Sequence, residues 1–244
     1  MLFSKKSKNV AFFICFCILI LVVGFLCGVY YIHNMIGDAS CVEYKSAIKK
    51  FERNGLNRGV VVFGSARIKN TDKHIKEIEE ISELCAKRIR DTKKPISFIT
   101  GGGPSVMEAW LKPAQKIGIQ TSGMAIKLPY EDALTKYADE RLSFTFREFS
   151  TRKKAMIKYA RAIVVFKGGY GSMDELFETL TLINTGRINP IPIFVYPRDF
   201  YVDVLNFNKF LDAKTISISD GRLITFFDSK EELLKELYKI IDNS

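Results

Sequence analysis

From residue 58 onward the chain alternates short apolar runs with amphipathic stretches, and this alternation constrains the fold more than any other feature. Apolar runs of this length, bounded by turn residues, are typical of buried strands. The runs are Gly59–Phe63, Ile96–Thr100, Thr121–Ile126, Ala162–Phe166 and Ile191–Tyr196. Strands that alternate with helices form a parallel sheet with helices on both faces. The pattern therefore predicts one doubly wound α/β domain over residues 58–244.

The stretches between these runs predict helices. Thr71 or Asp72 is placed to cap a helix that ends near Arg90, and its apolar residues recur at helical spacing, at Ile75, Ile78, Ile81, Leu84 and Cys85. Further helices are expected from Ser105 to about Lys116, from about Thr151, from Ser172 to about Asn184, and after Asp228-Ser229. Because ligands bind beyond the carboxyl ends of the strands in such a sheet, a site is expected in the loops that follow them.

The N-terminal region is a separate object. Residues 10–32 contain no charged side chain, and as a helix these 23 residues span roughly 34 Å, enough to cross a bilayer core of about 30 Å. This run predicts a single membrane helix, preceded by a basic segment over residues 1–9 and followed by a juxtamembrane linker and helix over residues 33–57. The alternative is a cleaved secretory signal, whose apolar region usually has only about 7–15 residues.

The charges around this run leave its orientation open. Lys5, Lys6 and Lys8 favour a cytoplasmic N-terminus and a domain on the outside. Basic residues such as Lys45 and Arg53 follow the run closely and weaken that asymmetry, and a nucleotide substrate would argue for the cytoplasm. The sequence thus predicts a single-pass membrane protein without fixing the side of its domain.

Composition narrows the class of protein. Hydrophobic residues make up 47% and charged residues 26%, which is globular, and the net charge is +10. The basic residues are spread rather than clustered, which favours a solvated surface over a nucleic-acid groove. Five Cys and two His are too few for a disulfide scaffold or a zinc ribbon. Cys41 and Cys85 can pair but nothing requires it, and we expect His33 and His74 at the surface.

Two glycine-rich loops follow predicted strands and precede predicted helices, Thr100-Gly-Gly-Gly-Pro-Ser105 and Lys167-Gly-Gly-Tyr-Gly-Ser172. Glycine lets main-chain N–H groups approach a ligand closely, and a helix N-terminus carries about half a positive charge. Each junction therefore suits an anion such as phosphate. Neither loop matches the G-x-G-x-x-G fingerprint or the nucleoside-triphosphate P-loop, which disfavours dinucleotide redox chemistry and ATP hydrolysis.

A plainer interpretation of these loops stays open at this point. Ser105-x-x-Glu108 and Ser172-x-x-Glu175 both match a capping box, in which the glutamate only caps its own helix. Ser229-x-x-Glu232 has the same pattern where no site is expected. Arg152 lies in a basic run and has the alternative of a solvated position.

Five segments in this order resemble the LOG (Lonely Guy) family, often labelled lysine decarboxylase-like: Val62–Arg67, Gly101–Glu108, Leu128–Glu131, Arg152-Lys153 and Gly168–Glu175. The resemblance covers about residues 58–240. It implies a Rossmann-like fold, usually a homodimer, with no metal and no pyridoxal phosphate. The implied activity is phosphoribohydrolase, which cleaves the N-glycosidic bond of a nucleoside 5′-monophosphate, of AMP or cytokinin type, to free base and ribose 5-phosphate.

The resemblance also implies site residues. Arg152 and Glu175 would be catalytic. Substrate contacts would come from Gly101, Gly102, Gly103, Glu131, Lys153, Gly168, Gly169, Tyr170, Gly171, Ser172 and Thr181. Breaking the bond between ribose C1′ and the base builds positive charge on the sugar, which a carboxylate stabilises while it orients or deprotonates water. An arginine offers a planar fork of donors for phosphate or ribose oxygens.

Departures from the family pattern put the substrate in doubt. Lys167 stands where the family usually has Pro, and Ser172 replaces the usual Thr. Ser105 replaces a small residue, commonly Gly, in the first loop, and Trp110 is large where relatives tend to have Ala. A membrane anchor is also unusual for the family. The competing function is therefore a membrane-anchored nucleotide sensor that binds without catalysis. Amino-acid decarboxylation would instead need a Schiff-base lysine in a pyridoxal site.

Overall fold

The computed structural model describes residues 18, 21–29, 39–128 and 134–244, and the chain divides into two compact units, Met1–Lys45 and Ser46–Ser244. In the first unit, residues 21–29 are helical with exposed side chains. Over these described ranges no helix combines the length and the apolarity that a bilayer crossing requires. Residues 10–17, 19–20 and 30–32 of the expected membrane helix, and His33, lie outside the described residues. The membrane helix therefore stays a prediction.

The second unit is built on a seven-stranded, all-parallel sheet in the order β4-β3-β2-β1-β5-β6-β7. The strands are β1 (Gly59–Phe63), β2 (Ser97–Thr100), β3 (Thr121–Ile126), β4 (Phe144–Phe146), β5 (Ala160–Val165), β6 (Ile193–Val195) and β7 (Ile224–Phe226). In the centre, Val62 of β1 pairs with Thr100 of β2 and with Val164 of β5. The loops that follow β2 and β5 therefore leave the sheet on either side of the loop that follows β1.

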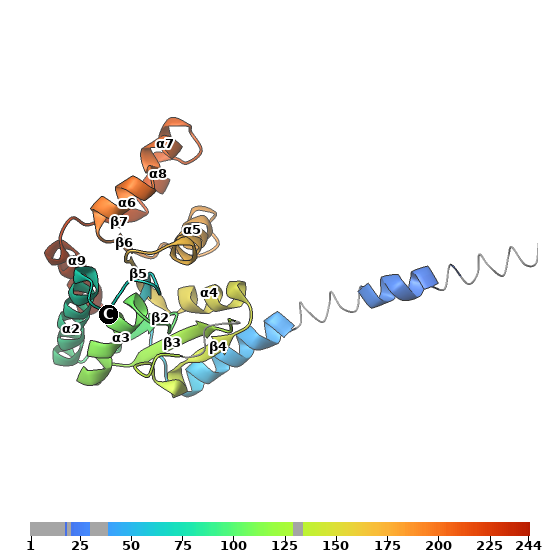
Figure 1. Ribbon diagram of the computed structural model, residues 1–244, viewed down its shortest axis with the longest axis horizontal. Coiled ribbons are helices and arrows are strands. Elements are labelled where there is room, and N and C mark those ends of the chain that lie inside the picture. Colours follow the sequence, from blue (N-terminus) through green and yellow to red (C-terminus); the bar gives the residue numbers. More distant parts are fainter. Residues whose placement is uncertain (1–17, 19–20, 30–38, 129–133) are drawn as a thin grey trace, which may run out of the picture. The chain divides into compact units, whose positions relative to one another are not determined.

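Helices cover both faces of this sheet. On one side lie α2 (Lys73–Thr92), α3 (Val106–Ile117) and α9 (Lys230–Asp242), and on the other lie α4 (Phe149–Lys158) and α5 (Tyr170–Asn184) (Figure 1). A helix over residues 39–53 precedes β1. Between β6 and β7 come three short helices, α6 (Arg198–Val204), α7 (Phe207–Asp212) and α8 (Ile218–Gly221), and a 3-10 turn, η1 (Glu140–Leu142), precedes β4. The predicted doubly wound parallel sheet is confirmed.

The sequence pattern missed the shortest elements. Strands β4 and β7 have three residues each, too few for an apolar run to stand out. The start of α5 was also misplaced, because the helix begins at Tyr170 with Gly169 as its N-cap rather than at Ser172. The α2 boundaries were predicted closely, since the Asp72 carboxylate accepts a hydrogen bond from the His74 N–H, as an N-cap should.

The core explains the alternation of apolar side chains along β1. Val60 and Val62 point into the layer of α2, α3 and α9, while Val61 and Phe63 are buried on the opposite face. Trp110 is fully buried and stacks on Phe98 with ring centroids 4.4 Å apart, so it is a core residue as its type suggests.

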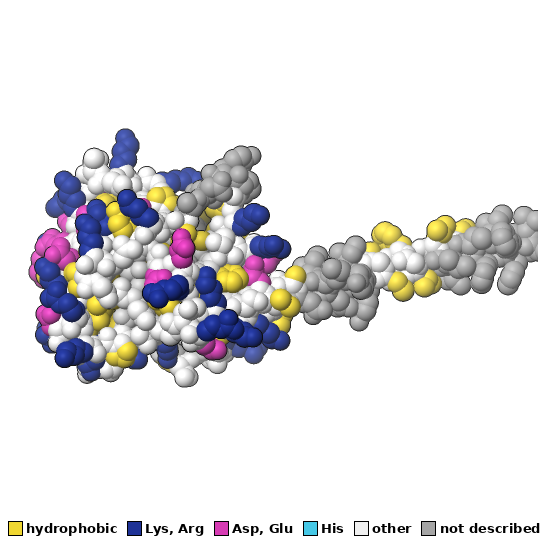
Figure 2. Space-filling view, turned by 90° about the horizontal axis from the view of Figure 1, so that it is seen from below, with side chains coloured by type: hydrophobic (Ala, Val, Ile, Leu, Met, Phe, Trp, Pro, Cys, Tyr) yellow, Lys and Arg dark blue, Asp and Glu magenta, His cyan; other side chains and the backbone are white. Residues whose placement is uncertain are grey.

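One smaller expectation is corrected, and one possibility that the sequence left open is decided. The expectation that His74 lies at the surface is wrong, because only 4% of it is exposed. Cys41 and Cys85 are both free thiols, Cys41 exposed and Cys85 buried, so the optional disulfide is not formed. Basic side chains are spread over the face shown in Figure 2, with acidic side chains among them.

Candidate active site

A cleft of about 1410 Å³ opens at the carboxyl ends of the central strands. Both glycine loops line it, together with the loop that follows β1. Of the residues named from the sequence, the cleft is lined by Gly101, Gly102, Gly103, Arg152, Gly168, Gly169, Tyr170, Gly171, Ser172 and Glu175. The fold therefore brings the two loops and the expected catalytic pair, 23 positions apart in the sequence, to one place.

The first glycine loop is closely packed against other segments of the chain. Gly102 has a φ of +74°, a conformation that favours glycine, and a Cβ there would lie 2.7 Å from the Leu134 side chain. Ser105, the N-cap of α3, also has a positive φ of 63°. Its hydroxyl does not cap the helix but donates to the Ile68 carbonyl at 2.8 Å. This loop is a fixed wall of the cleft.

The second glycine loop is packed at Gly168, where a Cβ would lie 2.2 Å from the Ser172 hydroxyl, and is open after it. A Cβ added at Gly169 or Gly171 would meet no atom within 4 Å, and Tyr170 is 98% exposed. The N-cap Gly169 has no side chain to cap α5. The N-terminus of this 15-residue helix therefore faces free space lined by main-chain N–H groups, which is the arrangement that binds anions.

One residue of the loop after β1 joins the two glycine loops. The Ser65 N–H donates to the Lys167 carbonyl at 2.9 Å, and the Ser65 carbonyl accepts from the Val106 N–H at 3.2 Å. Gly64 makes this approach possible, because a Cβ there would lie 2.4 Å from Val106. The relative position of the two loops is thus fixed through the central strand.

Arg152 and Glu175 form a buried ion pair at the floor of the cleft. Arg152 comes from α4 and Glu175 from α5, and they are only 9% and 7% exposed. Burial raises the pKa of Glu175 to about 7, against the opposing effect of the Arg152 charge. The Arg152 Nε donor has no hydrogen-bond partner among the described residues. Within the described part of the chain, the guanidinium therefore has a buried donor that no acceptor uses.

This pair excludes the capping interpretation for Glu175. Its carboxylate binds Arg152, and Ser172 lies inside α5 rather than at its N-cap. Glu108 likewise does not cap α3, since its carboxylate accepts from the Thr135 hydroxyl at 3.1 Å. Only Ser229 acts as its pattern suggests, accepting from the Glu232 N–H at 3.3 Å. The solvated alternative for Arg152 is also wrong, because the side chain is buried.

Of the described residues that the resemblance implies, Lys153 and Thr181 are not among those that line the cleft. The Lys153 ammonium binds the carboxylates of Asp174 and Glu178, at 2.8 and 2.5 Å. Thr181 is exposed on α5 and its hydroxyl donates to the Phe177 carbonyl. Glu131 lies outside the described residues.

The cleft also contains residues that sequence reasoning did not select. Arg67, Lys127 and Lys136 supply further positive charge along its lining, and Phe149 and Phe200 supply aromatic surface. Arg67 belongs to the Val62–Arg67 segment that carries the resemblance, so that motif contained the signal. No pattern marked Phe200, which lies in the short helix α6 between β6 and β7.

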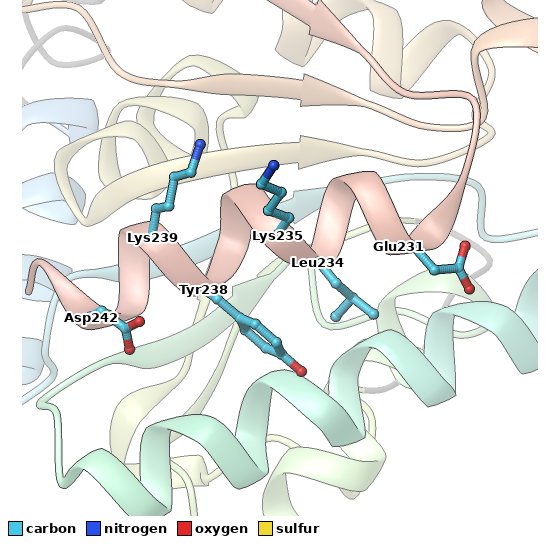
Figure 3. Close-up of a pocket in the computed structure, with 6 residues that line it drawn as sticks. All are labelled: Glu231, Leu234, Lys235, Tyr238, Lys239 and Asp242. Carbon is cyan, nitrogen blue, oxygen red and sulfur yellow. The ribbon is translucent and has the colours of Figure 1, made fainter.

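A second hollow, of about 470 Å³, lies along α9. Figure 3 shows that Leu234 and Tyr238 point toward α2 while Lys235 and Lys239 point the other way. One helix supplies all six lining residues, and Asp242 is already paired with Arg88. This hollow lacks the convergent polar groups of a ligand site. Within the described ranges, no three His, Cys, Asp or Glu side chains come together as a metal site would require.

Comparison with known proteins shows the family of the chain. Residues 107–237, more than half of the chain, match the family model described as "Possible lysine decarboxylase". The chain belongs to this family. The lysine decarboxylase-like resemblance drawn from the five motifs is thereby confirmed, and the matched span includes α4, α5 and the Arg152–Glu175 pair.

The chain is also similar to curated proteins with a more specific name. The chain is 32% identical over 88 residues to "Cytokinin riboside 5′-monophosphate phosphoribohydrolase LOG1" of Arabidopsis thaliana, which covers 35% of this chain and 41% of that protein. The corresponding LOG7 protein of the same plant is 33% identical over 88 residues, 35% of this chain and 40% of its own. The match thus spans about two fifths of the length of these relatives.

Solved structures share the fold at low identity. The Moco carrier protein from Chlamydomonas reinhardtii superposes with a TM-score of 0.51 at 15% identity, covering 77% of this chain and 99% of its own. The molybdenum cofactor binding protein from Rippkaea orientalis has a TM-score of 0.50 at 17% identity, covering 75% and 95%. At this low identity the similarity shows only that these proteins share a fold with this chain.

Proposed function

We propose that this protein hydrolyses the N-glycosidic bond of a nucleoside 5′-monophosphate, of AMP or cytokinin type, and releases the free base and ribose 5-phosphate. One observation carries the proposal: a single cleft is lined by the open N-terminus of α5 and by the buried Arg152–Glu175 pair. The names of the curated relatives, which are cytokinin riboside 5′-monophosphate phosphoribohydrolases, support it.

In this proposal the phosphate binds at the second glycine loop. Open space at Gly169 and Gly171 leaves room for the phosphate oxygens, and α5 adds the positive end of its dipole. Arg67 and Lys127 on the same cleft lining add attraction for an anion. The ribose would then lie over the floor of the cleft.

Glu175 supplies the chemistry at the sugar. As the C1′–N bond breaks, the ribose gains positive charge, and a carboxylate in a site shielded from water stabilises that charge strongly. A carboxyl with a pKa of about 7 is also suited to take a proton from the attacking water at neutral pH. Arg152 belongs to a different helix, α4, and its ion pair with Glu175 keeps the Glu175 carboxylate in place.

Aromatic side chains provide surface for the base. Phe149, Tyr170 and Phe200 line the cleft, and Phe149 and Tyr170 are 49% and 98% exposed. Planar bases stack on such rings with little demand for sequence-specific hydrogen bonds. This set supports a nucleotide over a small sugar phosphate.

A specific observation favours the second candidate, binding without catalysis. In the free protein Oε1 of Glu175 is already engaged by Arg152, so that oxygen is not available to the sugar or to a water molecule. If the pair persisted in the complex, the cleft would hold a nucleotide without cleaving it. Such a protein would act as a sensor or carrier.

The experiment incubates the full chain with a panel of nucleoside monophosphates and measures free base by chromatography. We expect release of base, reduced at least about 100-fold in Glu175→Gln, because the carboxylate acts directly on the reacting sugar. Asp174→Asn is the matched control: it removes the neighbouring carboxylate, which is half exposed and binds Lys153. Its rate should stay within about threefold of wild type. Tight nucleotide binding with no base released would overturn hydrolysis in favour of the sensor.

We also propose that residues 10–32 anchor the protein in a membrane and that it acts as a homodimer. The length and apolarity of the run support the first statement and the family resemblance supports the second. Protease protection of the domain in vesicles reports the side on which it lies. Molecular mass in detergent, by light scattering, reports the number of copies.

A further inference from the structure

The peptide of Lys167, at the start of the second glycine loop, is fixed on both sides. Its carbonyl accepts from the Ser65 N–H at 2.9 Å, which ties it to the loop after β1. Its N–H donates to Nε2 of His74 at 3.3 Å, which ties it to the first turn of α2. Gly168 follows and is closely packed, since a Cβ there would lie 2.2 Å from the Ser172 hydroxyl. The open part of the loop begins after it, at Gly169 and the fully exposed Tyr170.

His74 is itself held rigidly. Its main-chain N–H donates to the Asp72 carboxylate at 2.8 Å. Its ring lies against the rings of Phe166 and Tyr196, with centroids 5.8 and 6.1 Å away. Glu77, one turn further along α2, accepts from the Tyr196 hydroxyl at 3.1 Å. A ring in this aromatic setting has a defined orientation and a defined Nε2 position.

The protonation state of His74 suits the role of acceptor. Burial, with a further contribution from the Lys167 charge, lowers the pKa of His74 to about 4. The imidazole is therefore neutral at neutral pH, and because Nε2 accepts, the ring proton is on Nδ1. A protonated ring would present a donor to the Lys167 donor and break the contact.

We propose that His74 is a positioning residue for substrate binding, and that it sets the second glycine loop so that the loop's N–H groups converge on an anionic ligand. The inference rests on the proposed function in assigning that anion as the phosphate of a nucleotide. His74 itself does not line the cleft, so it acts through the Lys167 peptide. The Phe166 carbonyl, which accepts from the Tyr201 hydroxyl at 2.7 Å, anchors the end of β5 independently.

The test compares two replacements of His74 that differ in one property. Phe preserves the ring and its contacts with Phe166 and Tyr196 but has no acceptor, while Gln retains an acceptor that reaches the Lys167 N–H. The probes are inorganic phosphate and AMP, whose dissociation constants are measured by calorimetry on the full chain. We expect His74→Phe to weaken both at least tenfold and His74→Gln to weaken them less than threefold. At saturating AMP, the rate should fall less than threefold in either variant, since Arg152 and Glu175 are untouched.

A readout independent of activity is amide hydrogen exchange over residues 163–171. His74→Phe should speed exchange in this segment and leave the β1 and β2 segments unchanged, whereas His74→Gln should match wild type. Equal behaviour of the two variants, in affinity and exchange, would overturn the inference.

A second arm removes the donor instead of the acceptor. Lys167→Pro has no N–H, so the acceptor at residue 74 becomes unnecessary, and adding His74→Phe to it should produce no further loss of phosphate affinity. A further loss equal to that of His74→Phe alone would contradict the proposed contact. If His74→Phe folds poorly, Lys167→Pro alone still tests the contact, because it removes the donor and leaves His74 in place. If the wild-type protein binds phosphate but releases no base, the proposed reaction fails while His74 is still tested; if base is released and both His74 variants behave alike, only the inference fails.

Discussion

The two glycine loops occupy equivalent places on either side of β1, yet Gly102 in the first loop and Gly169 and Gly171 in the second are glycine for different reasons. In the first loop, Gly102 has a positive φ and sits against Leu134 and Gly123, so backbone and packing both require glycine. In the second loop, Gly169 and Gly171 have ordinary φ values and empty space where a Cβ would be. Folding alone does not demand glycine at these two positions.

The difference distinguishes the roles of the loops. A glycine with nothing around it costs conformational entropy on folding and gains no packing, so its use is to keep a space or an N–H group accessible. The first loop thus serves as a rigid wall, and the second as the surface that receives the ligand. Ser65 joins them, so that the wall also positions the receiving surface.

The largest expected effect comes from replacing one glycine in each loop by Ala. Gly102→Ala forces a side chain into a left-handed conformation and against Leu134, and should lower the free energy of unfolding by about 2–4 kcal/mol. Gly171→Ala lies within α5 with open space around it and should raise that free energy by up to about 1 kcal/mol. Urea denaturation of both variants measures the two signs.

For Gly171→Ala, the effect on ligand affinity should be opposite in sign to its effect on stability. Gly171→Ala places a methyl group where the ligand is proposed to bind, and we expect its affinity for AMP to fall about tenfold, or about 1.4 kcal/mol, despite the more stable fold. If Gly171→Ala binds AMP as wild type does, the second loop is not the receiving surface and the contrast between the loops is lost.

The next effect is the pH dependence of catalysis. The pKa of Glu175 is raised to about 7 by burial, so the fraction of active carboxylate falls as the pH decreases through 7. The ratio kcat/KM should therefore drop on the order of tenfold for each pH unit below about 6. An exposed carboxyl would keep the profile flat to about pH 5.5.

The substrate phosphate also titrates near pH 6, so the dissociation constant of AMP is measured over the same range and its change is subtracted. Asp174→Asn is the control. The charge of Asp174 contributes to the raised pKa of Glu175, so the variant should move the fall in rate to lower pH but should not abolish it, because this half-exposed residue is not the base. A corrected profile that stays flat from pH 8 to pH 5.5 would exclude Glu175 as the group that must be ionised.

The sequence predicted the frame of this site better than its contacts. Parallel strands bring their carboxyl ends to one edge, so the apolar runs before Gly101 and Gly168 were enough to place both loops there. The same spacing could not decide whether the Glu175 carboxylate capped its own helix or paired with another residue, because its partner Arg152 comes from a different helix. His74 was assigned to the surface since α2 has no local signal that its first turn packs under Lys167. Tertiary contacts between distant segments decided each of these cases.

A smaller effect is expected at the start of α3, where Ser105 combines a strained backbone with a compensating hydrogen bond. Ser105→Ala keeps the positive φ, removes the bond to the Ile68 carbonyl and should lower the free energy of unfolding by about 1–2 kcal/mol. Ser105→Gly loses the same bond but relieves the strain, worth about 1–2 kcal/mol, and should be close to wild type. Equal stability of the two variants, by thermal unfolding, would show that the backbone at this position carries no strain.

The smallest effect is expected at Lys153, for which the resemblance implies a substrate contact. Its ammonium is already neutralised by Asp174 and Glu178, and it is not among the residues that line the cleft. We therefore expect Lys153→Gln to change the dissociation constant of AMP less than threefold, within about 0.7 kcal/mol. Arg152→Gln, next to it in sequence but on the floor of the cleft, should weaken binding far more. Loss of tenfold or more in Lys153→Gln would mean that the ammonium leaves its carboxylates when the nucleotide binds, and the second loop would then recruit charge from α4 as well as from its own helix.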